Sequence, residues 1–233
     1  MSPSDDGLRI KRLWISGVLP GCDIKGRLAF YSASGNTNFM KLDSQQIVDL
    51  HTKLTDDWHR IDPAAGGEGF FLLVQENHLR NFQLWHEEDI ARRDDLGFER
   101  IYNAKRAIDG YNQQRNNFIE EMDKQLVEEL KPAESGVPFN SETPGMIIDR
   151  LSILALKEYH MREETEREDA SDEHKESCEF KLARIIQQRS DLARSLDELL
   201  EEIRAGRRSF AVYYQFKMYN DPALNPQLYG KKG

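Results

Sequence analysis

Apolar residues recur three and four positions apart along most of the chain after residue 40, which predicts a succession of helices. Gly- and Pro-containing segments separate these periodic stretches and predict the turns. We expect helices over 42–59, 69–93, 98–130, 144–166 and 173–204, then a short aromatic helix over 210–219 and an extended tail.

The stretch from Asn140 to Met161 predicts the central helix of the fold. Thr143 is a good N-cap, and Pro144 suits the first helical position because its backbone angle is already set. Apolar residues then cover most of the helix circumference, which is typical of a helix with neighbours on several sides. Polar residues interrupt this surface and need partners in the interior: Asp149, Arg150, Ser152, Lys157 and His160.

The second half of the helical region resembles the first half at an offset of 74 positions without gaps. Gln113-Gln114-Arg115 falls on Gln187-Gln188-Arg189, and His86 falls on His160. The apolar positions share the same register, which favours a duplicated helical hairpin. Two such hairpins with short turns predict an all-α fold, an antiparallel four-helix bundle with pseudo-twofold symmetry. An N-terminal helix and a C-terminal helix or extended tail complete it.

Residues 1–39 differ from the rest and predict a separate N-terminal extension, either poorly structured or formed of short strands. Residues 40–233 then form a single helical domain. Leu19-Pro20-Gly21-Cys22 has some likeness to a lipoprotein cleavage site, but the apolar segment before it is too short for a typical secretory signal.

Composition excludes several classes of function. The net charge of -9 argues against non-specific nucleic-acid binding, which needs a basic face. No apolar run approaches the roughly 20 residues that span a bilayer. Cys22 and Cys178 are the only cysteines, too few for a disulfide framework or a cysteine-rich zinc site. We therefore expect a reduced, cytoplasmic, soluble protein, and the sequence leaves oligomerisation open.

Arginine interrupts the apolar seam of two predicted helices, at Arg115 and Arg189. A buried guanidinium needs an acidic partner, a ligand or water. Folding each hairpin about its turn brings Arg189 level with Asp149, and we predict that these two residues form an ion pair. The layer is either a structural device that sets helix register or an anion- or sugar-binding cleft. The ligand-binding candidates are Gln75, His78, Arg115, Asp149 and Arg189, with His86 and His160 nearer the hairpin turns.

The sequence predicts no metal site and no cofactor. Di-iron bundles need Glu three residues before His, and none of the six histidines has it; Asp56 before His59 is the nearest approach. The acidic residues after His86 indicate a solvated helix end, because successive helical residues point in different directions. No glycine-rich phosphate loop or nucleophile motif is present, so the sequence identifies no catalytic residue.

Three stretches resemble the hallmarks of a bacterial domain-of-unknown-function family: Leu84–Asp89, Asn140–Met161, and the segment from Phe216 to Tyr229. The similarity runs from about residue 42 to residue 229. The resemblance implies a helical bacterial protein with no assigned chemistry, and an association with surface-polysaccharide synthesis.

Two hypotheses of function follow. The first is a non-enzymatic protein that binds an anionic small molecule, or a glycan-assembly enzyme, through the bundle and its tail. The second is an all-helical enzyme acting on an anionic or nucleotide substrate, either mutase-like, with arginine stabilising a dianionic transition state, or a metal-dependent pyrophosphohydrolase. Both enzyme hypotheses rest on analogy of architecture.

Overall fold

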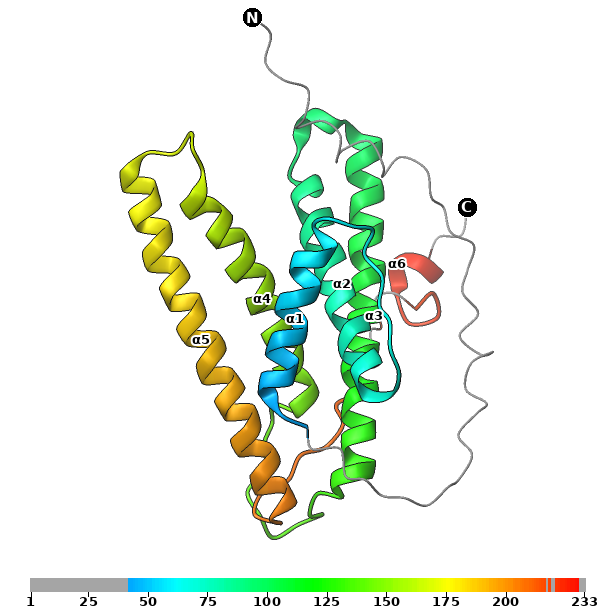
Figure 1. The fold of residues 1–233 in the computed structure, drawn as a ribbon. Coiled ribbons are helices and arrows are strands. Elements are labelled where there is room, and N and C mark those ends of the chain that lie inside the picture. Colours follow the sequence, from blue (N-terminus) through cyan, green and yellow to red (C-terminus); the bar gives the residue numbers. More distant parts are fainter. Residues whose placement is uncertain (1–41, 217, 219–220, 231–233) are drawn as a thin grey trace, which may run out of the picture. The chain divides into compact units, whose positions relative to one another are not determined.

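The computed structural model describes residues 42–216, 218 and 221–230, and the expectations for residues 1–39 lie outside this range. The all-α prediction is confirmed (Figure 1). Within the described residues, five long helices and two short ones follow one another: α1 (Ser44–Trp58), α2 (Gly69–Ala91), the 3-10 helix η4 (Asp94–Leu96), α3 (Phe98–Leu130), α4 (Pro144–Glu166), α5 (Asp172–Arg204) and α6 (Pro226–Tyr229).

Capping side chains explain where three of these helices begin. Asp43 accepts a hydrogen bond from the backbone of Gln45, and Ser171 accepts one from His174. Thr143 accepts one from Met146, with Pro144 in the first turn as predicted. Each cap satisfies a backbone N–H that the helix itself leaves unpaired. These local rules explain why the predicted bounds of the five long helices agree with the structure within two residues.

Helix α4 is the central element and contacts each of the other long helices, α1, α2, α3 and α5. Figure 1 shows α4 between α5 and α1, with the α2–α3 hairpin on the far side of α1. Phe70, Met122, Ile148 and Leu196 meet in the main core. Each such side chain contributes roughly 1.5–3 kcal/mol by burial. Helix α1 is part of this core, since Ile47 is fully buried in it.

The start of α4 rests directly on α3 through Gly145. Asp123 of α3 accepts a hydrogen bond from the backbone N–H of Gly145 at 2.7 Å, and it also bonds the hydroxyl of Thr143. A Cβ atom at position 145 would lie 2.7 Å from Asp123 Oδ1 and 2.9 Å from the carbonyl oxygen of Ile119. Glycine therefore permits this close approach, which fixes the position of α4.

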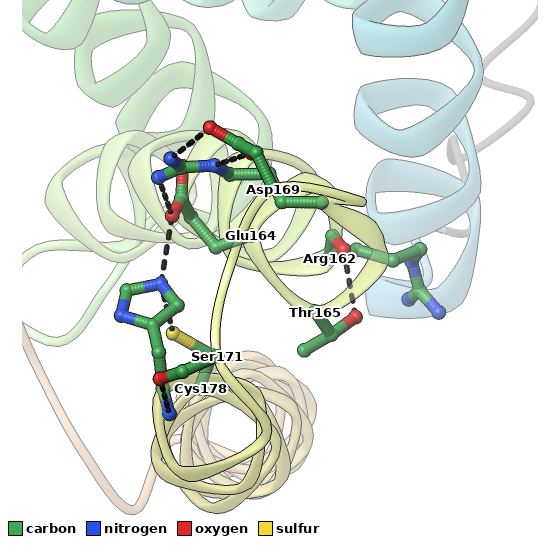
Figure 2. A network of polar contacts seen from close by, with 8 residues as sticks. Arg162, Glu164, Thr165, Asp169, Ser171 and Cys178 are labelled. Atoms are coloured by element: carbon green, nitrogen blue, oxygen red, sulfur yellow. Dashed lines mark hydrogen bonds and ion pairs between the residues drawn. The ribbon is translucent and has the colours of Figure 1, made fainter.

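The two hairpins have matching dimensions. Helices α2 and α4 each contain 23 residues, and α3 and α5 each contain 33. An arginine and an aspartate form a two-pronged ion pair at each hairpin turn: Arg93 with Asp95, and Arg167 with Asp169, the second of which is drawn in Figure 2. These features agree with the duplicated hairpin, which stays a prediction because nothing else tests a shared origin.

The segment after α5 differs from the prediction. Residues 210–216 form no helix, although a short helix was expected over 210–219. Ser209 instead pairs with the connection before α4, where its N–H donates to Pro138 and its carbonyl accepts from Asn140. Phe210 is buried in the main core and anchors the chain. Beyond it, residues 211–216 have no regular secondary structure, and Tyr213 packs edge-on against Phe139.

Candidate functional site

A buried polar layer lies in the N-terminal half of α4, where Asp149 contacts residues of the α2–α3 hairpin. Asp149 Oδ1 accepts hydrogen bonds from the side-chain amides of Asn77 at 3.0 Å and Asn81 at 2.9 Å, both on α2. The guanidinium of Arg115 on α3 lies 3.6 Å from the same oxygen. Two amides and one arginine thus compensate the buried carboxylate, as a buried charge requires.

The layer continues toward α1 through Ser152. The Ser152 hydroxyl accepts from Asn81 at 2.9 Å and lies 2.7 Å from Nδ1 of His78. The other ring nitrogen of His78 lies 3.0 Å from the hydroxyl of Thr55. We define the buried polar layer as Thr55, Asn77, His78, Asn81, Asp149 and Ser152. All six side chains are buried, so this network joins α1, α2 and α4 away from solvent.

The predicted ion pair between Arg189 and Asp149 is wrong. Arg189 bonds Glu158 at 3.0 Å and the backbone carbonyl of Val48 at 2.8 Å. The reason is the axial offset of α5 relative to α4. Lys157 of α4 and Gln188 of α5 line the same groove, so these two positions lie at similar heights. Arg189 therefore lies about two helical turns nearer the hairpin turn than symmetrical folding implies.

Of the other residues predicted for the layer, Arg115 and His78 lie in or beside it, and Gln75 does not. Arg115 lies opposite Asn77 of α2, as the hairpin geometry predicts, because its backbone carbonyl accepts from that amide. His78 belongs to the buried polar layer. Gln75 does not, since its side-chain oxygen accepts from the backbone of Gly66 in the loop before α2. The expected layer is thus present with a different membership.

His51 packs against His78 of the buried polar layer and is fully buried. Neither of its ring nitrogens has a hydrogen-bond partner among the described residues. Its ring centre lies 4.5 Å from that of His78. Burial lowers the pKa of His51 well below its usual value, and burial likewise lowers the pKa of His78 to about 3. Both rings are therefore neutral at neutral pH, and no solvent-facing group of the layer is left to meet a ligand.

A second polar group lies where the end of α1 meets α2 and α4. His59 follows the last residue of α1, His86 lies in α2 and His160 lies in α4; we define these three residues as the histidine cluster. Each offers a ring nitrogen within 4.8 Å of the others. Their ring centres are 5.0, 5.4 and 5.9 Å apart, and the ring planes stand at 67–81° to one another. The rings therefore meet edge to face around a common point.

Hydrogen bonds fix the orientation of two of these rings. Nδ1 of His59 lies 2.7 Å from the backbone carbonyl of Thr55, and Nδ1 of His160 lies 2.7 Å from a carboxylate oxygen of Glu163. A carbonyl and a carboxylate can only accept, so Nδ1 carries the proton in each ring when the ring is neutral. The opposite nitrogen, Nε2, is then an acceptor. In both rings Nε2 is buried and has no hydrogen-bond partner in the part of the chain that the structure describes.

Aromatic side chains hold the cluster from the outside. Tyr159 stacks on His59 with 3.9 Å between ring centres, and Trp85 stacks on His160 at 4.7 Å. Phe82 packs edge-on against His59 and His86. Such contacts restrict ring rotation, so the ligating edges are set before any ligand arrives.

Burial also sets the protonation of the cluster. Burial, with the neighbouring histidines, lowers the pKa of His86 to about 4 and that of His160 to about 4. Both rings are neutral at neutral pH and present lone pairs. Neutral imidazole is the form that binds metal ions.

A family model of proteins of unknown function, DUF4254, matches residues 72–212. The chain belongs to the DUF4254 family. The matched region contains His86, His160 and most of the buried polar layer, whereas His59 and Thr55 on α1 precede it. DUF4254 itself assigns no chemistry to these residues, and no curated protein or solved structure matches the chain.

Sequence reasoning did not predict that His59, His86 and His160 meet. The 74-position offset pairs His86 with His160, which was the available indication that they meet across the pseudo-twofold axis. His59 lies outside the repeat, and its position depends on the packing of α1. Within the described part of the chain, no helix has the length and hydropathy needed to cross a membrane.

Proposed function

We propose that this DUF4254 protein is an accessory binding protein, with the histidine cluster as its ligand site. The observation that carries the proposal is the pair of buried, unpaired Nε2 atoms of His59 and His160, which converge with the ring of His86. Unpaired polar atoms at the edge of a fold are costly unless something binds them. The three residues of the cluster are partly buried as whole residues.

The hydrogen bonds within the buried polar layer also favour the histidine cluster as the ligand site. Asp149, His78 and Ser152 have hydrogen-bond partners on neighbouring helices, and none of the three is exposed. An anionic ligand in this layer would have to displace those partners from the interior. A structural role fits the layer better, because a paired buried network specifies helix register.

The carboxy-terminal segment provides a second contact surface for an accessory protein. Phe216 is 83% exposed, and Tyr214, Met218, Leu224 and Tyr229 are also exposed. Clustered exposed apolar side chains usually mark a docking site. The net charge of -9 disfavours anionic lipid, so we infer a protein partner. A glycan-assembly enzyme, as the family resemblance implies, is the first partner to test, in the cytoplasm.

Ligand binding is tested by a thermal-shift screen of the whole protein. The panel contains nucleotide sugars, sugar phosphates, inorganic polyphosphate and divalent transition-metal ions, applied to the parent, His160→Gln and the control His174→Gln. We expect one class to raise the Tm of the parent and the control but not of His160→Gln. A ligand that stabilises all three equally, or no stabilisation at all, contradicts the assignment of the site.

Partner binding is tested by co-purification with candidate glycosyltransferases of surface-polysaccharide synthesis. Phe216→Asp should weaken the association by at least about tenfold, since burial of a phenylalanine is worth roughly 1.5–3 kcal/mol. Phe98→Asp is the matched control, because Phe98 is 93% exposed at the α2–α3 turn. Equal losses in both variants would remove the carboxy-terminal segment as the docking site.

A metal-dependent hydrolase is the second candidate function, and the histidine cluster is what favours it, since three histidines with a free coordination position can activate water. The mutase-like alternative loses support. Arg189 is already hydrogen-bonded to Glu158, and Arg115 lies 3.6 Å from the carboxylate of Asp149, so an anionic transition state would compete with a carboxylate at each guanidinium.

A further inference from the structure

We propose that the histidine cluster binds one divalent transition-metal ion of the zinc class. Nε2 of His59, Nε2 of His160 and one ring nitrogen of His86 are the ligands, and at least one coordination position is left for water or an external ligand. This inference rests on the proposed function, because it names the ligand of the same site.

In His59 and His160, the ring nitrogen that would not bind the metal makes the hydrogen bond that is typical of metal-binding histidines. A ligating histidine commonly donates its other N–H to a carboxylate or a backbone carbonyl, which fixes the tautomer and raises the basicity of the ligating nitrogen. His160 has the carboxylate of Glu163 in this role, and His59 has the carbonyl of Thr55. The nitrogen left without a hydrogen bond in each ring is Nε2, and a ring nitrogen of each of the three histidines lies within 4.8 Å of the others.

The spacing of the rings fits a tetrahedral ion. With a metal–nitrogen distance of about 2.0–2.1 Å, three histidine ligands of a tetrahedral ion have ring centres about 5 Å apart. The observed separations are 5.0 Å between His59 and His160, 5.4 Å between His59 and His86, and 5.9 Å between His86 and His160. His86 makes no hydrogen bond to any described residue, so no hydrogen bond opposes the small shift of its ring that closes the remaining gap.

The charges around the site favour a cation. His59 follows the C-terminus of α1, where the helix dipole is negative. Glu163 lies beside His160, and Asp89 also interacts favourably with the charged form of that ring. An anionic ligand alone would meet these carboxylates. The cation is therefore the first occupant, and any anion would bind through it.

The donor set selects the kind of ion. Three imidazoles suit Zn²⁺ and its neighbours Co²⁺, Ni²⁺ and Cu²⁺, whereas Mg²⁺, Ca²⁺ and Mn²⁺ prefer oxygen ligands. Three histidines with one open position is also the ligand set of many reactive zinc sites. The open position lets the ion hold a water molecule or an external donor.

A rival site lies at the α4–α5 turn and must be separated from the cluster. Nε2 of His174 lies 2.9 Å from Glu164 and 3.4 Å from the sulfur of Cys178, and the labelled partners are drawn in Figure 2. These contacts already occupy Nε2 of His174, whereas Nε2 of His59 and Nε2 of His160 have no hydrogen-bond partner among the described residues. The cysteine nevertheless gives this site a spectroscopic signature, because thiolate-bound Co²⁺ has an intense near-ultraviolet charge-transfer band.

The experiment is a Co²⁺ titration of the metal-stripped whole protein, followed by competition with Zn²⁺. We expect one ion per chain, the visible absorption of low-symmetry four- or five-coordinate Co²⁺, and no thiolate band. His86→Gln and His160→Gln should each weaken binding by more than about 100-fold. Glu163→Gln should weaken it by about tenfold, the lower end for a partly exposed partner of a ligating histidine. His174→Gln and Cys178→Ser are the matched controls and should leave affinity unchanged.

Two results overturn the inference. Absence of Co²⁺ and Zn²⁺ binding does so, as does binding that survives in the cluster variants and disappears in His174→Gln or Cys178→Ser. Fluorescence of Trp85, which stacks on His160, separates this failure from failure of the proposed function. If the tryptophan signal responds to a nucleotide sugar or sugar phosphate in metal-free protein, and not in His160→Gln, the ligand site stands and only the metal is wrong.

Discussion

The buried polar layer and the histidine cluster use similar residues, on overlapping helices, in opposite ways. In the layer, both nitrogens of His78 meet hydroxyl groups, and the whole network is buried. In the cluster, Nδ1 of His160 is held by Glu163, and Nε2 has no hydrogen-bond partner among the described residues. A polar group that is paired inside the protein supports the fold, whereas convergent unpaired groups near the surface support binding. The predictions below test this distinction.

The largest effect is expected for Asp149→Ala in the layer. The substitution leaves Asn77, Asn81 and the guanidinium of Arg115 without their shared acceptor, and should cost about 3–5 kcal/mol. Urea unfolding measures it. Asp191→Ala is the control, because the exposed pair of Asp191 with Arg194 should contribute less than about 1 kcal/mol. Equal losses for the two variants would mean that the layer does not support the fold.

A matched pair of histidine substitutions separates the two regions directly. His78→Phe leaves Thr55 and Ser152 each short of a buried partner, and should cost about 2–4 kcal/mol. His86→Phe removes a ring with no hydrogen bond beside the apolar Phe82, so the free energy of unfolding should change by less than about 1 kcal/mol. Both are read by urea unfolding without metal. A larger cost at His86 than at His78 would reverse the comparison.

The layer should also make the protein sensitive to acid. The folded pKa of His78 is about 3 against an ordinary 6.5, so its contribution is fully present above pH 6.5 and falls as the pH falls toward 3. At about 1.4 kcal/mol per pH unit, His78 alone loses about 2 kcal/mol between pH 6.5 and pH 5.

Asp123 has the opposite effect on stability, because burial raises its pKa to about 6. Its contribution to the free energy of unfolding is therefore lost as the pH rises from 3.8 to 6. His51, whose pKa burial also lowers, acts in the same direction as His78, so the histidines dominate. Urea unfolding at pH 7 and pH 5 measures the balance. Greater stability at pH 5 would show that His78 is not buried in the neutral form.

The smallest effect concerns the anchor that positions α4, which carries residues of both regions. Gly145→Ala places a Cβ atom 2.7 Å from Asp123 Oδ1 and should cost about 1–3 kcal/mol. Gly110→Ala in α3 meets nothing within 4 Å and should stabilise the helix by roughly 0.5–1 kcal/mol. Thermal unfolding compares the two glycines. A neutral Gly145→Ala would show that α4 does not need this close contact.

The sequence predicts the helices well because their bounds are local. Thr143, Pro144 and the apolar periodicity act within a few residues, and the helix that they predict is the one observed. The partners of buried charges are not local. Arg189 meets Glu158 because α4 and α5 are offset by about two turns, and periodicity does not encode that offset.

The histidine cluster depends on three helices at once. The 74-position repeat relates His86 to His160, but α1 stands outside the repeat, so no spacing connects His59 to either residue. The sequence expectation of no metal site rested on motifs within single helices. A site assembled from three separate helices carries no such motif, and the packing of α1 against α2 and α4 creates it.

The most direct test of the account is nitrogen NMR of the histidine rings at pH 7, with and without one equivalent of Zn²⁺. In metal-free protein, Nδ1 of His59 and Nδ1 of His160 should each carry a proton, because each faces an oxygen acceptor. Zn²⁺ should then shift Nε2 of both rings and one nitrogen of His86, while the signals of His51, His78 and His174 stay in place. Protons on Nε2 of His59 and His160, or Zn²⁺-induced shifts at His174 instead, would contradict the account.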